Sequence, residues 1–244
     1  MEINPVSIPS QEAVESATSL YNAIHTAFPK AVADFESKWA AAQALCHSQT
    51  ALVAKDDASI QTEEFDALER LGPKIIPLIV FKLARGDTGQ DSWGLDNSLE
   101  KDPDYCPRPD EDLQRCSNQV VEFNYQRNKI VKERVEAWKE QNRVNSLQST
   151  TLVFTGCEEY FDLLDMGPSI IGHLMVEYYY DQGGYWYELL HEITHGRKMG
   201  AHVVQKPVLF EAYCRFFNEE EHDQAPEYIP TAIDRWIYHG ERAD

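Results

Sequence analysis

Residues 65–83, FDALERLGPKIIPLIVFKL, decide the fold, because the chain repeats their pattern at residues 161–179 as FDLLDMGPSIIGHLMVEYY. In each copy a short amphipathic segment ends at a glycine, and a proline then starts a second segment that is apolar almost all round. A segment of that composition belongs in the centre of a helical protein. The pattern predicts two related pairs of helices with the Gly-Pro dipeptides 72–73 and 167–168 at their corners. Pro77 should kink its helix or make the first turn irregular.

The other segments also have helical patterns. Apolar residues at helical spacing predict a hairpin of helices in residues 1–48, and Ser10 is a suitable N-cap. A long basic helix is predicted over residues 112–145, because residues 115–143 hold seven basic and four acidic side chains. No segment alternates with a period of two, as a half-buried strand would. We therefore expect one compact all-α domain over residues 1–244, made of about nine helices.

The repeat also suggests how the domain is organised. Residues 62–100 form the first predicted helical unit and residues 157–200 the second. Repeated helix pairs are typical of HEAT-like elements. Two copies at so long a period do not make a solenoid, so a compact domain with two HEAT-like units is the better interpretation.

The chain is strongly acidic, with 22 Lys and Arg against 41 Asp and Glu, and a net charge of −19. This charge disfavours nonspecific binding to nucleic acid or anionic membrane and suits a cationic or amino-acid-derived small molecule. No apolar run approaches the roughly 18 residues of a membrane span, and the N-terminal residues lack the regions of a signal peptide. The five cysteines are scattered and form no C-x-x-C. We expect a cytoplasmic protein without a membrane partner.

The segment 185–202, YWYELLHEITHGRKMGAH, holds the densest set of chemically active side chains. On a helix, four acidic and imidazole side chains at i, i+3, i+4 and i+7 share one face. Carboxylates and imidazoles gathered in this way can exchange protons with a substrate. The candidate catalytic residues are Glu188, His191, Glu192 and His195.

The two copies of the repeat differ in polarity. With the glycines aligned, Leu78 corresponds to His173 and Lys82 to Glu177. A turn at residues 181–184 should fold the helix back, so that His173 and Glu177 face the candidate catalytic residues and aromatic side chains line the pocket. The alternative is that all these polar groups are surface or satisfied core residues. The predicted substrate-binding residues are His173, Glu177, Tyr180, Tyr185 and Trp186.

Residues 191–195 match H-E-x-x-H, in which two imidazoles one helical turn apart can bind one metal ion. A zinc hydrolase needs a third protein ligand. Glu211 and Glu219 are candidates, but no diagnostic spacing supports them, and Gly196 and His202 are out of register with the metzincin pattern. We therefore expect no metal or other cofactor, and a metal-dependent hydrolase stays as an alternative.

The basic helix offers a weak nucleic-acid-binding surface, for which the candidates are Arg127, Lys132 and Arg134. Lysine and arginine on one helix face can contact a phosphate backbone. The alternative is a solvated face with i,i+4 ion pairs.

Four blocks of the sequence, residues 71–80, 121–140, 158–202 and 222–230, resemble a fungal family of small helical hypothetical proteins, and the likeness covers residues 62–237. Proteins of this kind are similar to fungal arginine-containing cyclodipeptide synthases. The resemblance implies an enzyme that condenses arginine with a second amino acid, both drawn from aminoacyl-tRNA.

That resemblance is compatible with the residues in one respect and not in another. An acidic, aromatic pocket with Glu177 suits a guanidinium group, whereas a net charge of −19 speaks against strong RNA binding. The leading hypothesis is a small-molecule biosynthetic enzyme that forms amide bonds. A non-catalytic HEAT-like interaction module is the alternative.

Overall fold

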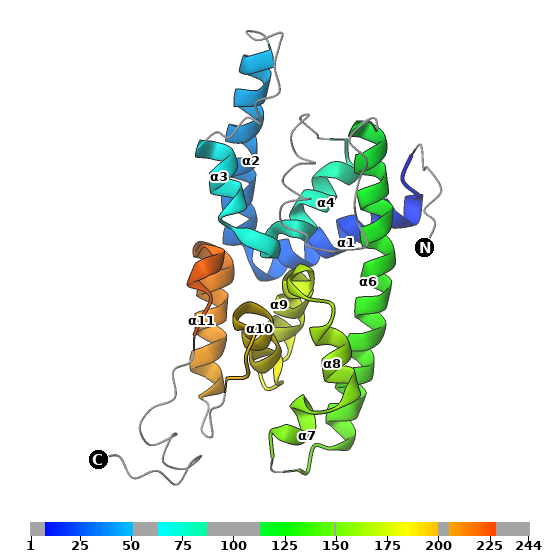
Figure 1. Ribbon diagram of the computed structural model, residues 1–244, viewed down its shortest axis with the longest axis vertical. Helices are drawn as coiled ribbons and strands as arrows, with labels where there is room; N and C mark the ends of the chain where they lie inside the picture. The colour runs from blue at the N-terminus through cyan, green and yellow to red at the C-terminus, as the bar shows by residue number, and fades with distance from the viewer. Residues whose placement is uncertain (1–7, 51–62, 87–112, 149, 200–204, 228–244) are drawn as a thin grey trace, which may run out of the picture.

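The computed structural model describes residues 8–50, 63–86, 113–148, 150–199 and 205–227 (Figure 1). The described residues form ten α-helices and three short 3-10 helices, and no strand. The all-α prediction is thus confirmed. The α-helices are α1 (Gln11–Ala27), α2 (Pro29–Thr50), α3 (Glu63–Glu69), α4 (Ile76–Ala84), α6 (Leu113–Val144), α7 (Leu152–Thr155), α8 (Glu158–Leu164), α9 (Ile171–Tyr180), α10 (Trp186–His195) and α11 (Lys206–Glu219). The 3-10 helices are η1 (Gly72–Ile75), η2 (Pro168–Ile170) and η3 (His222–Gln224).

Helix α6 runs along one side of the molecule over most of its length, and α11 lies on the opposite side (Figure 1). Helices α8, α9 and α10 lie between them, and α1 and α4 lie across the middle of the molecule (Figure 1). The buried apolar side chains of these helices form one continuous core. Trp138 of α6 is fully buried there, and its Nε1 donates to the carbonyl of Phe154 at 2.8 Å. The described helices therefore belong to one domain.

The predicted N-terminal hairpin is present as α1 and α2, apart from residues 1–7, which lie outside the described part. Ser10 caps α1, because its Oγ accepts a hydrogen bond from the backbone N–H of Ala13 at 3.2 Å. Phe28 leaves the helical conformation with φ −135°, and Pro29 then starts α2.

Each copy of the repeat forms a short helix, a Gly-Pro 3-10 turn and an apolar helix: α3, η1 and α4 in the first, α8, η2 and α9 in the second. Gly72 and Gly167 have φ of 72° and 70°, in the left-handed region that favours glycine. Pro77 follows an irregular first turn, as predicted. HEAT-like packing of the two units is not confirmed, and residues 87–100 of the first lie outside the described part.

The two copies meet at equivalent positions. Gly172 of α9 is aligned with Pro77 of α4, and a Cβ on Gly172 would lie 2.8 Å from Cγ of Pro77. Helices α4 and α9 can approach this closely only because the residue at 172 has no side chain.

Replacing Gly172 with alanine should therefore lower the free energy of unfolding. Overpacking costs about 1–3 kcal/mol, and the better helix propensity of alanine, about 1 kcal/mol, offsets only part of it. Gly183→Ala is the control, because its Cβ would meet nothing closer than 3.7 Å. Urea unfolding of both variants measures the difference. Equal stabilities would show that the contact between the copies is not tight.

Ion pairs tie each unit to the long helix that precedes it in the chain. Lys82 of α4 lies 2.5 Å from Glu36 of α2, and Glu177 of α9 lies 2.5 Å from Lys139 of α6. Lys82 and Glu177 occupy aligned positions of the repeat. The same ion pair between a helical unit and a long helix is therefore made twice. The first unit supplies the basic residue of its pair, and the second unit supplies the acidic one.

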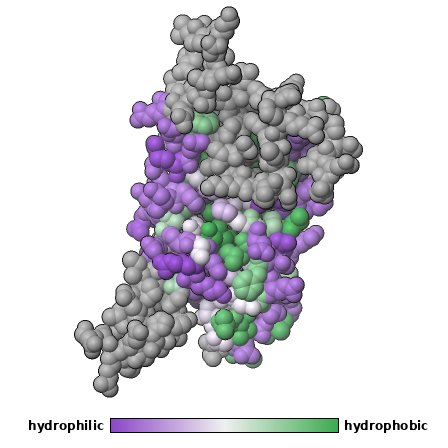
Figure 2. All heavy atoms as spheres, viewed as in Figure 1, coloured by the Kyte–Doolittle hydropathy of each residue, from purple (hydrophilic) through white to green (hydrophobic). Residues whose placement is uncertain are grey.

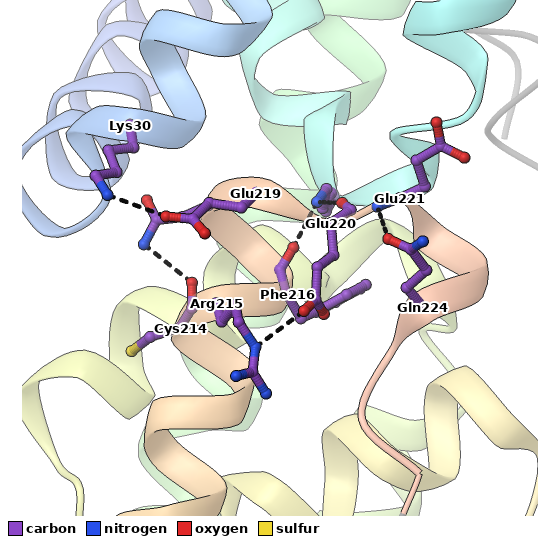
Figure 3. A network of polar contacts seen from close by, with 10 residues as sticks. Lys30, Cys214, Arg215, Phe216, Glu219, Glu220, Glu221 and Gln224 are labelled. Carbon is purple, nitrogen blue, oxygen red and sulfur yellow. Dashed lines mark hydrogen bonds and ion pairs between the residues drawn. The ribbon is translucent and has the colours of Figure 1, made fainter.

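The C-terminal end of α11 is held by a network of polar contacts (Figure 3). Lys30 pairs with Glu219 at 3.0 Å and Arg215 with Glu220 at 2.9 Å. Beneath them lies Lys74, which is only 3% exposed and donates to the carbonyls of Phe216, at 2.7 Å, and Glu220. The carbonyl of Phe216 also accepts from the backbone N–H of Glu220 at 3.3 Å, so Lys74 adds a second donor to it and supplies a donor to the carbonyl of Glu220, just beyond the helix.

In the coloured part of the face that Figure 2 shows, hydrophilic residues predominate, and hydrophobic residues gather in the middle and at the lower end, around α7. Val144, Leu147 and Leu152 are 65%, 98% and 67% exposed there. In the described part of the chain, every helix is too short or too polar to cross a lipid bilayer.

Candidate functional site

Helix α10 carries the four candidate catalytic residues and is fixed at both ends. At its start, the Nε1 of Trp186 donates to Asp181 at 3.1 Å. At its end, Gly196 adopts the left-handed conformation with φ 66°, and its N–H donates to the carbonyl of Glu192. Between these points α10 packs against α8, α9 and α11. The helix is therefore part of the core.

His191 lies in the interior, with an exposed fraction of 0%. Its Nδ1 lies 2.9 Å from the carbonyl oxygen of Arg197. A carbonyl only accepts hydrogen bonds, so Nδ1 must carry the proton and Nε2 the lone pair. That Nε2 is buried without a hydrogen-bond partner. Burial is the largest effect on the pKa of His191 and lowers it below 6.5, so the ring is a neutral base at pH 7.

His195 lies beside His191, with 4.6 Å between the ring centroids. Its Nε2 lies 3.0 Å from the carbonyl oxygen of Pro226, and this bond assigns the proton to Nε2. The two neighbouring imidazoles therefore carry their protons on different nitrogens. Each is oriented by a backbone carbonyl, as a metal ligand or general base would be.

The two carboxylates of α10 have different surroundings. Glu188 is 5% exposed, and burial raises its pKa above 4.5, although the backbone of Met199 and the charge of Lys198 oppose the shift. Glu192 accepts a hydrogen bond from the hydroxyl of Tyr160 at 2.7 Å. Burial and Glu192 raise the pKa of Tyr160, so the phenol stays protonated and keeps donating.

The arrangement can therefore perform acid–base chemistry. The surroundings push the pKa of His191 down and that of Glu188 up, so a neutral imidazole and a carboxyl that binds a proton more readily than usual lie on adjacent turns of one helix. Opposed shifts of this kind are the usual sign of an acid and a base with separate roles.

Two of the predicted substrate-binding residues, His173 and Glu177, contact α6. His173 is 9% exposed, and its Nε2 lies 2.9 Å from Oδ1 of Asn128 on α6. Glu177 pairs with Lys139, also on α6. The expectation that both face the candidate catalytic residues is therefore wrong. The physical reason is that a buried polar side chain must find a partner, and α6 presents one at each position.

Burial, together with the charges of Lys132 and Arg127, lowers the pKa of His173 to about 4, so its ring is neutral at pH 7. The crevice beside it leaves only about 10 Å³ for the centre of a water molecule. That is about the volume one water needs, so the crevice does not admit a substrate.

Most of the predicted aromatic substrate-binding residues pack against other side chains of the protein. Tyr185 stacks on Phe154, with ring centroids 4.3 Å apart, and the amine of Lys206 lies 4.1 Å from the centroid of the Tyr185 ring. Trp186 is 1% exposed and is a core residue. Tyr180 is 66% exposed and leaves a surface for contact. The predicted aromatic wall thus consists mostly of packed side chains.

Two of the three candidate nucleic-acid-binding residues hold the second unit in place. Arg127 donates to the carbonyl of Met166 at 2.8 Å and to the hydroxyl of Ser169. Arg134 donates to the carbonyl of Asp162 at 2.5 Å. Both satisfy carbonyls at and just beyond the end of α8. Lys132 is exposed.

Within the described residues, no group of three or more His, Cys, Asp or Glu side chains is placed to hold a metal ion. Of the ligands considered for the H-E-x-x-H pattern, Glu219 is paired with Lys30, and His202 lies outside the described part of the chain.

The structure adds contributors that the sequence did not single out, namely the hydroxyl of Tyr160 and the carbonyls of Arg197 and Pro226. Tyr160 is far from α10 along the chain, and backbone carbonyls carry no side-chain signal.

No protein-family model, no curated protein and no solved structure matches this chain.

Proposed function

We propose that this chain is a small-molecule biosynthetic enzyme in which His191 is the general base. The observation that carries the proposal is the fully buried ring of His191, which is held through Nδ1 and has no partner at Nε2. An unsatisfied buried acceptor lowers stability by about 1–3 kcal/mol. A substrate N–H or O–H directed at Nε2 would supply the missing donor and begin proton transfer.

For the substrate, the resemblance to arginine-containing cyclodipeptide synthases gives the most specific proposal. In that reaction the α-amine of one aminoacyl group attacks the ester carbonyl of another, an amide bond forms, and the first tRNA hydroxyl leaves. The free α-amine of the resulting dipeptidyl ester then attacks the remaining ester carbonyl, which closes the diketopiperazine with a second amide bond and releases the second tRNA hydroxyl. His191 would accept the proton of the attacking amine, and Glu188 would donate one to the leaving oxygen. The net charge of −19 suits the cationic side chain of an arginyl group, although it disfavours strong binding of the tRNA that carries this group.

The proposal is tested by expressing the chain in a heterologous host and comparing extracts by mass spectrometry with those of the empty host. New arginine-containing diketopiperazines are the expected result. Their absence from a host that accumulates folded protein, verified by a helical circular dichroism spectrum, would contradict the substrate assignment.

The same experiment separates the alternatives. A non-catalytic interaction module would produce no new metabolite, and substitution of His191 would then change stability or partner binding alone. A metal-dependent hydrolase would give activity that a chelator removes and zinc restores.

A further inference from the structure

The segment 221–227, the strap, follows α11 and contains η3. It crosses from the end of α3 to the end of α10, because its first residues contact Arg70 and its last residues contact His195 and Arg197. Of its residues, only Ala225 is buried.

The first end of the strap is anchored by several contacts. The backbone N–H of His222 donates to the carbonyl of Arg70 at 2.8 Å, and Arg70 pairs with Glu221 at 2.9 Å. Glu221 and Gln224 form a reciprocal capping box around η3 (Figure 3). The side chain of His222 also fills the space that a Cβ on Gly72 would occupy.

The other end has fewer anchors. The carbonyl of Pro226 accepts from Nε2 of His195 at 3.0 Å, and Glu227 pairs with Arg197. The side chains of this pair are 48% and 50% exposed, and ion pairs so exposed hold weakly. The Arg70–Glu221 pair at the first end is as exposed, at 49% and 43%, so the difference lies in the backbone bond of His222, the capping box and the packing of His222 on Gly72. Within the described residues, the strap is therefore held more firmly at the α3 end than at the α10 end.

The less firmly held end lies at the histidine pair. Pro226 bonds to His195, whose ring neighbours that of His191, and the charge of Glu227 reaches both imidazoles. His191 has an exposed fraction of 0%, so no substrate reaches its Nε2 unless a neighbouring element moves. Helices α8, α9 and α11 are built into the core. The strap reaches the histidine pair through its bond to His195, and only Ala225 of the strap belongs to the core, so the strap can move at a lower cost than these helices.

We propose that the strap is a gate over His191 and that the Arg197–Glu227 ion pair is its latch. The gate opens by releasing Pro226 and Glu227 from α10 while the contacts around Arg70 remain. Its role in admitting substrate rests on the proposed function of His191. The opening itself is a property of the fold and can be measured without any activity.

The test uses diethyl pyrocarbonate, which transfers an ethoxycarbonyl group to an unprotonated imidazole nitrogen and releases ethanol and carbon dioxide. The modification rate of each histidine is followed at pH 7 by peptide mass spectrometry in the full chain. Loss of one exposed ion pair should raise the open population, and with it the rate at His191, about 1.5-fold to fivefold in Arg197→Gln and Glu227→Gln. The exposed His25 is the internal reference and should not change.

Arg143→Gln is the matched control, because it breaks another exposed Arg–Glu pair, with Glu140, on a distant part of α6. An unchanged rate at His191 in both latch variants would overturn the proposal, and so would an equal increase in Arg143→Gln. Failure of the proposed function gives a different result: no diketopiperazine forms, while the labelling rates still respond to the latch.

Discussion

His191→Ala is expected to abolish product formation while the protein stays folded. A positioned general base contributes about 10²–10⁴-fold to a rate, and alanine leaves no group to accept the proton. Alanine also removes the unpartnered Nε2 and the bond from Nδ1 to the carbonyl of Arg197. The measurement is the yield of new diketopiperazine in extracts of cells that hold equal amounts of each protein.

His25→Ala is the control for this prediction, since His25 is exposed on α1 and far in sequence from the site. It should give the wild-type yield. Glu188→Gln keeps the shape of the side chain but cannot release a proton, so we expect it to lower the yield as well. Full activity of His191→Ala would remove the imidazole from the mechanism and favour a structural role.

The pH dependence follows from the direction of the shift at His191. Its pKa lies below 6.5, so more than half of the rings are still unprotonated at pH 6.5 and the midpoint of their titration lies below that value. The rate measured with purified protein should therefore keep more than half of its maximum down to pH 6.5. A rate that halves at or above pH 6.5 would show that another group limits the reaction.

Local patterns predicted much of the fold. The basic helix, predicted over residues 112–145, is α6 at Leu113–Val144. The Gly-Pro corners at 72–73 and 167–168 form as predicted because a glycine with positive φ followed by proline has few alternatives. The short helix α7 lies outside the predicted helices, since its four residues carry too little periodicity to detect.

The candidate site was predictable only in part. Helical periodicity placed Glu188, His191, Glu192 and His195 on one helix, but it does not say which element each side chain faces. His173 and Glu177 turned to α6 because Asn128 and Lys139 are there to satisfy them. Tertiary contacts of this kind depend on how helices pack, and the spacing of residues along one helix does not encode that packing.

The basic face of α6 illustrates the same limit. A row of arginines in the sequence suggested contacts with phosphates, whereas Arg127 and Arg134 bind carbonyl groups of the second helical unit. Arginine serves both purposes through the same N–H groups. Only the position of α8 against α6 distinguishes a ligand-binding arginine from one that holds the fold together.

Lys74→Met is expected to destabilise the fold, and the loss should grow as the pH rises. The substitution keeps most of the apolar side chain but removes the donor to the carbonyls of Phe216 and Glu220. The carbonyl of Phe216 keeps its bond from the N–H of Glu220, whereas the carbonyl of Glu220 loses the donor from Lys74, and the loss of such a bond costs about 1–3 kcal/mol. The control is Lys30→Met, because the ion pair of Lys30 with Glu219 is exposed and its loss should change stability little.

The contribution of Lys74 to the free energy of unfolding increases as the pH rises. Burial lowers the pKa of Lys74 from 10.5 to about 8 in the folded protein, although Asp34, Glu220 and Glu221 oppose the shift. Between these two values the unfolded chain binds more protons than the folded one, so the contribution of Lys74 to stability rises with pH. It is complete above pH 10.5 and is lost as the pH falls through about 8.

The hydrogen bonds from Lys74 to the two carbonyls persist when its amine loses a proton. It retains two N–H groups, one for each carbonyl, and no longer keeps a charge in the interior. The stability difference between wild type and Lys74→Met should therefore widen by about 2 kcal/mol from pH 7 to pH 9.5. Taking the difference cancels the buried tyrosines, which titrate in both proteins. A difference that stays constant or narrows, measured by urea unfolding at each pH, would mean that the hydrogen bonds of the charged amine outweigh its burial.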